Sequence, residues 1–167
     1  MFDRKSVRLK GFDYSTPGAY YITLCVYNKE PHFGKIEEGE VILNKVGEMV
    51  RGEWIKSERI RKEIKIDSFV IMPNHMHAIV WIVNNRCNRA NHRSPLHKRR
   101  VHMFPNSISS LIAGFKSVTT KTFRKMQNCH FGLWQRNYYE HIIRNDIDLM
   151  RIRKYIQDNP TKWEMDY

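Results

Sequence analysis

The sequence has few cysteines and no long apolar run. Its three cysteines, Cys25, Cys87 and Cys129, lie far apart and form no CxxC pair. This pattern argues against a disulfide framework and a thiolate zinc site, and it favours a reducing compartment. The longest apolar run, residues 78–83, is far too short to cross a bilayer, and the N-terminal stretch "MFDRKSVRLKGFDYS" lacks the apolar core of a secretory signal. We therefore expect a cytoplasmic protein with no membrane association.

Acidic residues are also scarce. The chain carries 29 Lys and Arg against 17 Asp and Glu, a formal net charge of +12. A positive field attracts polyanions, and nucleic acid is the commonest polyanion in a cytoplasm. The alternative is a basic soluble protein with no such partner. A basic membrane-surface protein is disfavoured, because no segment joins a strongly apolar face to a Lys/Arg face.

The length and patterning predict one domain, residues 1–167. With 167 residues and 41% hydrophobic residues, the chain can bury a core of its own. Strands are predicted at 18–28, 64–72, 75–83 and 132–144, a hairpin with a Glu-Gly turn at 32–44, and helices at 44–64, 106–126 and 145–159. The first helix is capped by Asn44, and the last is capped by Asn145 or Asp146 and stops before Pro160. This order predicts an α+β fold, an antiparallel sheet with helices packed on one face.

A basic segment at about residues 84–103, "NNRCNRANHRSPLHKRRVHM", contains no acidic residue. It has no apolar periodicity, so we expect a mobile loop. The loop either closes on phosphates or is a solvated linker. Its basic residues, the first group of candidate nucleic-acid contacts, are Arg86, Arg89, Arg93, Lys98, Arg99 and Arg100.

Two histidines lie one residue apart in the otherwise apolar stretch "FVIMPNHMHAIVWI". Alternate side chains of a strand point to one face, so His75 and His77 are expected side by side. We expect Met76, Ile79 and Trp81 to line the opposite, packed face. Two imidazoles on one face can bind a metal. Most His-x-His pairs, however, are surface pairs or core histidines with satisfied hydrogen bonds.

The last predicted helix carries two more polar candidates. Tyr155 and Asn159 in "RKYIQDNP" are four residues apart, hence on one helical face. The carboxamide oxygen of Asn159 is a hard third ligand suited to Mg²⁺ or Mn²⁺, and Tyr155 would place a phenol beside that metal. On spacing alone, the simpler interpretation is that Tyr155 covers a core and Asn159 ends the helix ahead of Pro160.

Three segments, "MPNHMHAIVW", "LWQRNYYEHIIR" and "YIQDNP", resemble the REP-associated tyrosine transposases. These are relatives of the bacterial single-tyrosine insertion-sequence transposases, within the HUH superfamily named for its His-hydrophobic-His motif. The resemblance covers residues 18–163, and the motifs occur in the family's order. It implies a ferredoxin-like antiparallel sheet with helices, the HUH endonuclease fold, in agreement with the predicted order of elements.

The resemblance also implies a metal-dependent nuclease site. His75 and His77 match the histidine ligands, Asn159 the polar residue that completes the site for Mg²⁺ or Mn²⁺, and Tyr155 the nucleophile. Attack of Tyr155 on a DNA phosphate would leave a covalent 5′-phosphotyrosine and a free 3′-hydroxyl, so ends can be rejoined without a nucleotide cofactor. The imidazoles favour Mn²⁺ for affinity, but both metals remain open.

Three other residues of these motifs, Tyr138, Tyr139 and His141, lie outside the implied metal site and nucleophile. Tyr138 and Tyr139 are rival tyrosines that we interpret as packing or DNA-stacking residues. Tyr155 must lose a proton, and its base is not assigned. His141 is one candidate, although a structural role fits it equally well.

The partner implied is single-stranded DNA, or a hairpin with single-stranded flanks, of the imperfectly palindromic kind that the family cuts. Accessible phosphates and unstacked bases suit a tyrosine nucleophile surrounded by aromatic and basic residues. The affinity should fall steeply with salt. A second group of candidate phosphate contacts, on the second predicted helix, comprises Lys116, Lys121, Arg124 and Lys125, with a solvated helix face as the alternative.

Two other functions remain open from the sequence. One is a catalytically silent regulator that binds hairpin DNA or RNA, against which the presence of all four site residues argues. The other is a small rolling-circle or relaxase-type initiator, although such proteins usually carry further domains. The sequence does not decide between a monomer and a homodimer, nor whether Tyr155 acts on its own chain's site or on a partner's.

Overall fold

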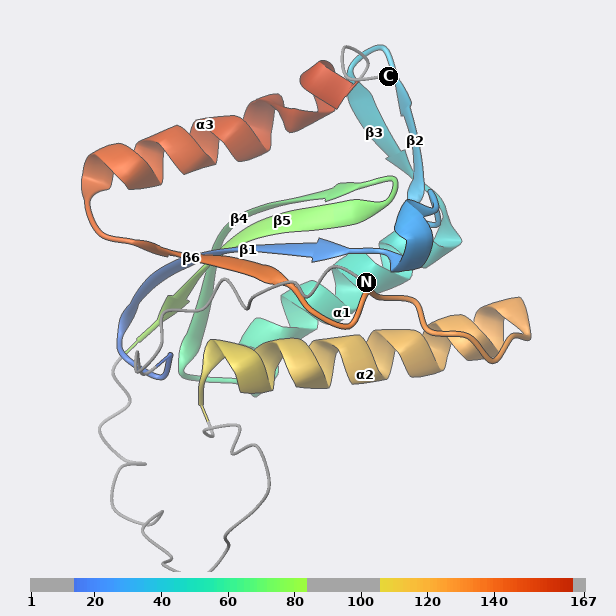
Figure 1. Ribbon diagram of the computed structural model, residues 1–167, viewed down its shortest axis with the longest axis horizontal. Helices are drawn as coiled ribbons and strands as arrows, with labels where there is room; N and C mark the ends of the chain where they lie inside the picture. Colours follow the sequence, from blue (N-terminus) through green and yellow to red (C-terminus); the bar gives the residue numbers. More distant parts are fainter. Residues whose placement is uncertain (1–13, 84–105, 164–167) are drawn as a thin grey trace, which may run out of the picture.

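The computed structural model describes residues 14–83 and 106–163, and Figure 1 shows how its helices and strands are arranged. The candidate nucleic-acid contacts at 86–100 therefore lie outside the described residues. In chain order the elements are β1 (Gly18–Cys25), a 3-10 turn η1 (Tyr27–Lys29), β2 (Gly34–Glu37), β3 (Glu40–Leu43), α1 (Lys45–Ile60), β4 (Ile64–Met72), β5 (His75–Ile82), α2 (Ile108–Gln127), β6 (Tyr139–Ile143) and α3 (Asp146–Trp163).

The main sheet has four strands in the order β4-β5-β1-β6, and every neighbouring pair is antiparallel. With α1 after β1 and α2 after β5, this is the ferredoxin-like arrangement of two interleaved βαβ units. The predicted α+β, ferredoxin-like fold is thus confirmed. The predicted hairpin is also confirmed: β2 pairs with β3, and the turn residues Glu38 and Gly39 have the positive φ angles of a tight hairpin turn.

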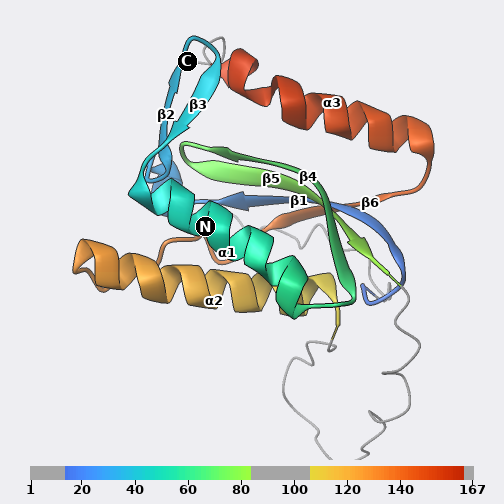
Figure 2. The same ribbon diagram turned by 180° about the vertical axis from the view of Figure 1, so that it is seen from behind.

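The two faces of the sheet are covered by different helices (Figures 1 and 2). On one face α1 and α2 close the larger core, which includes the fully buried Tyr20, Ile22 and Leu24 of β1. On the other face Leu149, Ile152 and Ile156 of α3 form a smaller cluster with residues of the sheet. The predicted packing of helices on one face therefore holds for α1 and α2, whereas α3 covers the opposite face.

The alternation of side chains along β5 corrects one expectation. Met76 belongs to the core beneath α1 and α2, as predicted. Ile79 and Trp81, expected on that same face, instead pack with the α3 cluster. The reason is the two-residue period of a strand: positions 75, 77, 79 and 81 differ by even numbers, so all four side chains share one face.

The helix boundaries follow from local capping. The Asn44 side chain accepts from the backbone N–H groups of Val46 and Gly47, at 2.9 and 3.0 Å, and starts α1. Ser107 and Ser110 form a reciprocal capping box at the start of α2. Asn145 Oδ1 accepts from the Asp148 N–H at 2.8 Å ahead of α3. These caps explain why the predicted helix starts agree closely with the structure.

Four predicted boundaries are wrong. The first strand ends at Cys25 and not at residue 28, and α1 ends at Ile60 and not at residue 64. We expected α3 to stop before Pro160, but the helix continues through it to Trp163. Proline removes only one backbone donor, and here the loss falls in the last turn of the helix. The strand predicted at 132–144 is reduced to β6, preceded by an isolated bridge between Val26 and Trp134. Within 14–83 and 106–163, no helix is both long enough and apolar enough to cross a bilayer.

Candidate active site

The four residues predicted as a nuclease site come from two elements that lie face to face. His75 and His77 occupy the start of β5, and Tyr155 and Asn159 lie on α3. The rings of His77 and Tyr155 have centroids 5.3 Å apart, and the Asn159 side chain interacts with the imidazole of His75. The placement of α3 over the histidine face of the sheet therefore brings together residue pairs that are 78 and 84 positions apart in the sequence.

The two histidine rings converge through the same nitrogen. His75 Nε2 and His77 Nε2 are 3.0 Å apart. A metal with ligand distances of about 2.1 Å holds two nitrogens at right angles about 3.0 Å apart. The spacing of this pair therefore fits two adjacent positions in one coordination shell.

Each histidine is held by its other nitrogen. His75 Nδ1 lies 2.7 Å from Asn74 Oδ1, and the Asn74 amide donates to the Lys29 carbonyl at 3.1 Å. His77 Nδ1 lies 2.8 Å from the hydroxyls of both Tyr21 and Thr23. Such outer contacts orient the ring and select the nitrogen that remains available to a metal.

These outer contacts were missed from the sequence. Tyr21 and Thr23 belong to β1, and only the antiparallel register, which pairs Thr23 with His77, brings them to the histidine. The spacing of Tyr21 and Thr23 in "YYITLC" indicated that they share one face of a strand. It did not indicate that this face also carries His77. Asn74 falls between the strands predicted at 64–72 and 75–83, and the sequence indicated no partner for its side chain.

Burial keeps both imidazoles neutral near pH 7. Desolvation, assisted by the charge of Lys29, lowers the pKa of His75 to about 4, against a smaller opposite effect of Asn159. Desolvation and the neighbouring His75 lower the pKa of His77 to about 3. A metal ligand must be unprotonated, so both side chains are in the state that binds metal.

The third candidate ligand is a carboxamide and not an ionisable group. Asn159 is only 9% exposed and lies on the same face of α3 as Tyr155. In the described part of the chain, no three or more His, Cys, Asp or Glu side chains cluster in a way that could hold a metal. The side chains that could hold a metal here are His75, His77 and Asn159 through its oxygen, a mixed nitrogen and oxygen set compatible with Mn²⁺ or Mg²⁺.

Tyr155 is the accessible tyrosine beside the histidines. It is 42% exposed, and its ring meets that of Tyr21 edge-on at 6.4 Å. Burial raises the pKa of Tyr21 well above its usual range, and the nearby Tyr155 adds to the effect, so Tyr21 stays protonated. The two rival tyrosines lie in different environments. Tyr138 packs against the larger core, whereas Tyr139 is 44% exposed and contacts Tyr21.

His141, a candidate base for Tyr155, is engaged elsewhere. Its Nε2 lies 2.7 Å from Asp148 Oδ2 in the first turn of α3, and Arg151 donates to the other oxygen of that carboxylate at 2.6 Å. These partners hold the pKa of Asp148 below its usual range. The contacts give His141 a part in joining β6 to α3.

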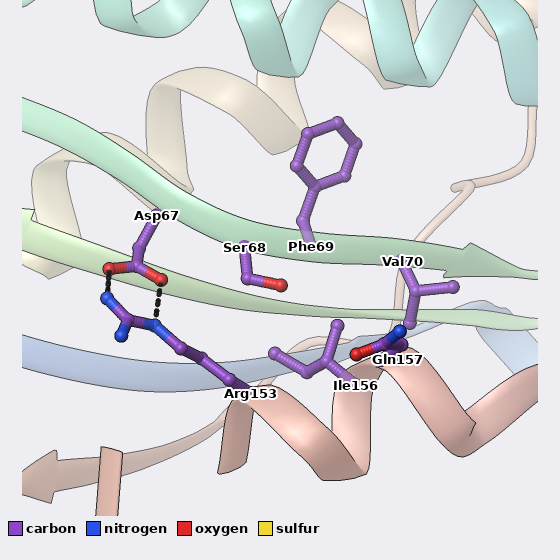
Figure 3. A pocket seen from close by; sticks show the side chains of 7 residues that line it. All are labelled: Asp67, Ser68, Phe69, Val70, Arg153, Ile156 and Gln157. Atoms are coloured by element: carbon purple, nitrogen blue, oxygen red, sulfur yellow. Dashed lines mark hydrogen bonds and ion pairs between the residues drawn. The ribbon is translucent and has the colours of Figure 1, made fainter. Parts of the chain in front are cut away.

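A second contact fastens α3 to the edge strand β4 (Figure 3). Arg153 forms a two-pronged pair with Asp67, Nε to Oδ1 at 2.7 Å and Nη2 to Oδ2 at 2.5 Å. The indole of Trp81 donates to the same carboxylate at 2.9 Å. An open cavity of about 600 Å³ lies beside the pair, between β4 and α3. Asp67, Arg153 and Trp81, which we call the α3 clamp, hold the helix that bears Tyr155 against its own sheet.

The predicted phosphate contacts belong to α2, which lies on the other side of the sheet from α3, the helix that carries Tyr155 (Figure 1). Lys116 is partly buried; its ammonium donates to the carbonyls of Gln135 and Asn137 at 2.8 and 3.0 Å, and burial lowers its pKa to about 8. Arg124 Nε donates to the Phe131 carbonyl at 3.0 Å. Lys121 and Lys125 are exposed. Contact of these four residues with DNA stays a prediction.

The comparisons with known proteins agree with this architecture. No family model matches the chain. A solved structure of a REP-associated tyrosine transposase bound to a REP hairpin has a TM-score of 0.60 at 23% identity, covering 97% of this chain and 74% of that chain. An uncharacterized protein of Haemophilus influenzae is 40% identical over 170 residues, 98% of this chain and 91% of that protein. A second Haemophilus influenzae protein, assigned provisionally to the REP-associated tyrosine transposases, is 29% identical over 92 residues, 55% of this chain and 47% of its own.

The fold is thus that of the REP-associated tyrosine transposases, and the resemblance stated from the sequence is confirmed. The chain belongs to the same family as the uncharacterized Haemophilus influenzae protein, which it matches over nearly its whole length.

Proposed function

We propose that the protein is a metal-dependent, single-stranded DNA endonuclease and strand transferase, a transposase of the single-tyrosine HUH type. The observation that carries the proposal is the convergence of Tyr155 with the two inward-facing Nε2 atoms of His75 and His77 and with Asn159. The relatives named for transposition, one of them bound to a REP hairpin, support it.

In the proposed reaction, the Tyr155 oxygen attacks a backbone phosphorus in line with the bond to the 3′ oxygen. The new bond is a phosphotyrosine ester to the 5′ side; the broken bond releases the 3′ oxygen, which takes up a proton as a hydroxyl. Tyr155 gives its own proton to water, which its exposure makes accessible. The ester conserves the bond energy, so a 3′-hydroxyl can attack it and rejoin the strand.

His75, His77 and Asn159 would hold a single Mn²⁺ or Mg²⁺. When bound, this ion polarises a non-bridging phosphate oxygen and neutralises charge that develops on the phosphate. The chain's own contribution is positional: two neutral imidazoles, and a tyrosine held at the edge of the same face. Tyr155 contacts the rings of His77 and Tyr21 but keeps 42% of its surface exposed, which leaves it accessible to a DNA strand.

The proposed substrate is a hairpin with single-stranded flanks. Tyr139 and Tyr155 expose 44% and 42% of their surfaces on the histidine face, so unpaired bases could stack on them. A net charge of +12 supplies the attraction to the phosphate backbone. A stem would place its paired bases out of reach of the tyrosine, so cleavage is expected beside the stem and not within it.

We propose further that each chain completes its own site. Tyr155 lies over the histidines of its own sheet, and the α3 clamp ties the helix there. If so, a mixture of Tyr155→Phe and His77→Ala proteins should remain inactive, because neither chain can supply the missing group to the other. Recovery of activity in the mixture would demonstrate exchange of α3 between chains.

The decisive experiment uses labelled hairpin oligonucleotides from the host genome with single-stranded flanks. The protein is incubated with Mn²⁺ or with EDTA, beside Tyr155→Phe and the matched control Tyr139→Phe. We expect an SDS-resistant protein–DNA adduct that requires metal, disappears in Tyr155→Phe and persists in Tyr139→Phe. Salt-sensitive binding without an adduct would favour the silent hairpin-binding regulator. An adduct lost only in Tyr139→Phe would identify Tyr139 as the nucleophile in place of Tyr155.

A further inference from the structure

We propose that Asn74 is a positioning residue that fixes the tautomer of His75 and so presents its Nε2 lone pair for metal binding. The inference rests on the proposed function for the metal, but its first step concerns only the protein. Asn74 precedes His75 in the turn between β4 and β5 and is 6% exposed.

The orientation of the Asn74 carboxamide follows from its two contacts. One end lies 3.1 Å from the Lys29 carbonyl oxygen, which can only accept, so that end must be the amide nitrogen. The other end is then the carbonyl oxygen, 2.7 Å from His75 Nδ1. Because this oxygen also can only accept, His75 Nδ1 must carry the hydrogen. In a neutral imidazole, Nε2 of His75 is consequently unprotonated.

The turn that holds Asn74 is itself fastened. The Val26 N–H donates to the Asn74 carbonyl at 2.9 Å, and the Phe33 N–H donates to the Pro73 carbonyl at 3.0 Å. These bonds tie the turn to the segment that follows β1. The Asn74 carboxamide is therefore already oriented in the metal-free protein. Metal binding to His75 then requires no free energy for a change of tautomer.

His77 is held in a different way. Its Nδ1 faces the hydroxyls of Tyr21 and Thr23, each of which can donate or accept. Without metal, His77 Nε2–H can donate to the bare Nε2 of His75 across 3.0 Å, while Nδ1 accepts from a hydroxyl. For His77 Nε2 to be free for a metal, this proton would have to move through solvent to Nδ1, which would then donate to a hydroxyl, with no net change in charge. His75 is the fixed ligand of the pair and His77 the adaptable one.

The test compares Asn74→Leu, which keeps the approximate size but loses the acceptor, with Asn74→Asp, which retains an acceptor. In metal-free wild-type protein, ¹⁵N NMR of the imidazoles should show His75 protonated at Nδ1. The Leu variant should lose this preference and bind Mn²⁺ roughly 10- to 100-fold more weakly by titration, as typically follows loss of a ligand's outer hydrogen bond. The Asp variant should keep the Nδ1–H form and a Kd closer to that of wild type.

Wild-type His75 found protonated at Nε2 would overturn the inference whatever the variants do. So would an Asn74→Leu variant that keeps the Nδ1–H form, or that binds Mn²⁺ as tightly as Asn74→Asp. Failure of the proposed function has a different signature: wild-type protein would show the Nδ1–H form of His75 but no Mn²⁺ binding and no DNA adduct.

Discussion

Acidification between pH 7 and pH 5 should destabilise the metal-free protein through its two site histidines. An unfolded histidine has a pKa of about 6.5, whereas burial lowers the folded pKa values of His75 and His77 to about 4 and about 3. Between pH 7 and pH 5, His75 and His77 therefore take up protons in the unfolded chain but stay largely neutral in the folded chain. Stability is complete above pH 6.5 and is lost as the pH falls towards the folded pKa values.

The magnitude follows from the same shifts. At pH 5 the unfolded form of each histidine is almost fully protonated and the folded form almost neutral, which costs roughly 2 kcal/mol per histidine relative to pH 7. Together the pair would remove roughly 3 to 4 kcal/mol, a large part of the 5 to 15 kcal/mol typical of a domain. The loss should level off only below pH 3, where both histidines are protonated in the folded and the unfolded states.

The assay is urea unfolding followed by tryptophan fluorescence at pH 7, 6 and 5, with EDTA present throughout. The control is the double variant His75→Gln, His77→Gln, which removes both titrating groups but keeps polar side chains. Asp67 and Asp148, whose pKa values are lowered by Arg153 and by His141, titrate below this window and so cancel in the comparison. Equal pH dependence of wild type and double variant from pH 7 to pH 5 would refute the reasoning.

Two further predictions concern stability. Arg153→Met should lower the free energy of unfolding by roughly 1 kcal/mol, because the charge-assisted bonds to the partly buried Asp67 are lost, while the exposure of Arg153 to solvent weakens the pair. Urea unfolding measures this, and a loss below a few tenths of a kcal/mol would mean that the Arg153–Asp67 pair contributes nothing. Gly47→Ala should destabilise by roughly 1 to 3 kcal/mol, since a Cβ there would lie 2.2 Å from the Phe33 carbonyl oxygen. Gly52→Ala on the same helix, where a Cβ meets no atom within 4 Å, should stabilise by about 0.5 to 1 kcal/mol; thermal melting of both variants gives the comparison, and similar Tm values would contradict it.

The elements could be predicted because their causes are local. The cap at Asn44, the Glu38-Gly39 turn and the apolar runs of β4 and β5 are each set within a few residues, so the sequence alone defined most of the elements and their order. The types of residue expected at the site, two histidines on one strand face and a tyrosine and asparagine one helical turn apart, were equally local. The predicted end of α3 before Pro160 was wrong because proline is disfavoured in the interior of a helix but is tolerated in its last turn.

The meeting of the two halves of the site could not be predicted by such arguments. Whether α3 packs with α1 and α2 or on the opposite face depends on which apolar surfaces remain uncovered after the sheet forms, and this depends on contacts far apart in the sequence. The register of β1 against β5 likewise placed Thr23 beside His77.

The sequence by itself therefore determined the fold class, the helix caps and the candidate ligands, since propensity and periodicity operate over short distances. Tertiary structure decided that Tyr155 lies over His77, that Arg153 reaches Asp67, and that the Asn74 carboxamide faces His75 with its oxygen. Each of these depends on side-chain packing and hydrogen bonding between segments that only the folded chain brings together.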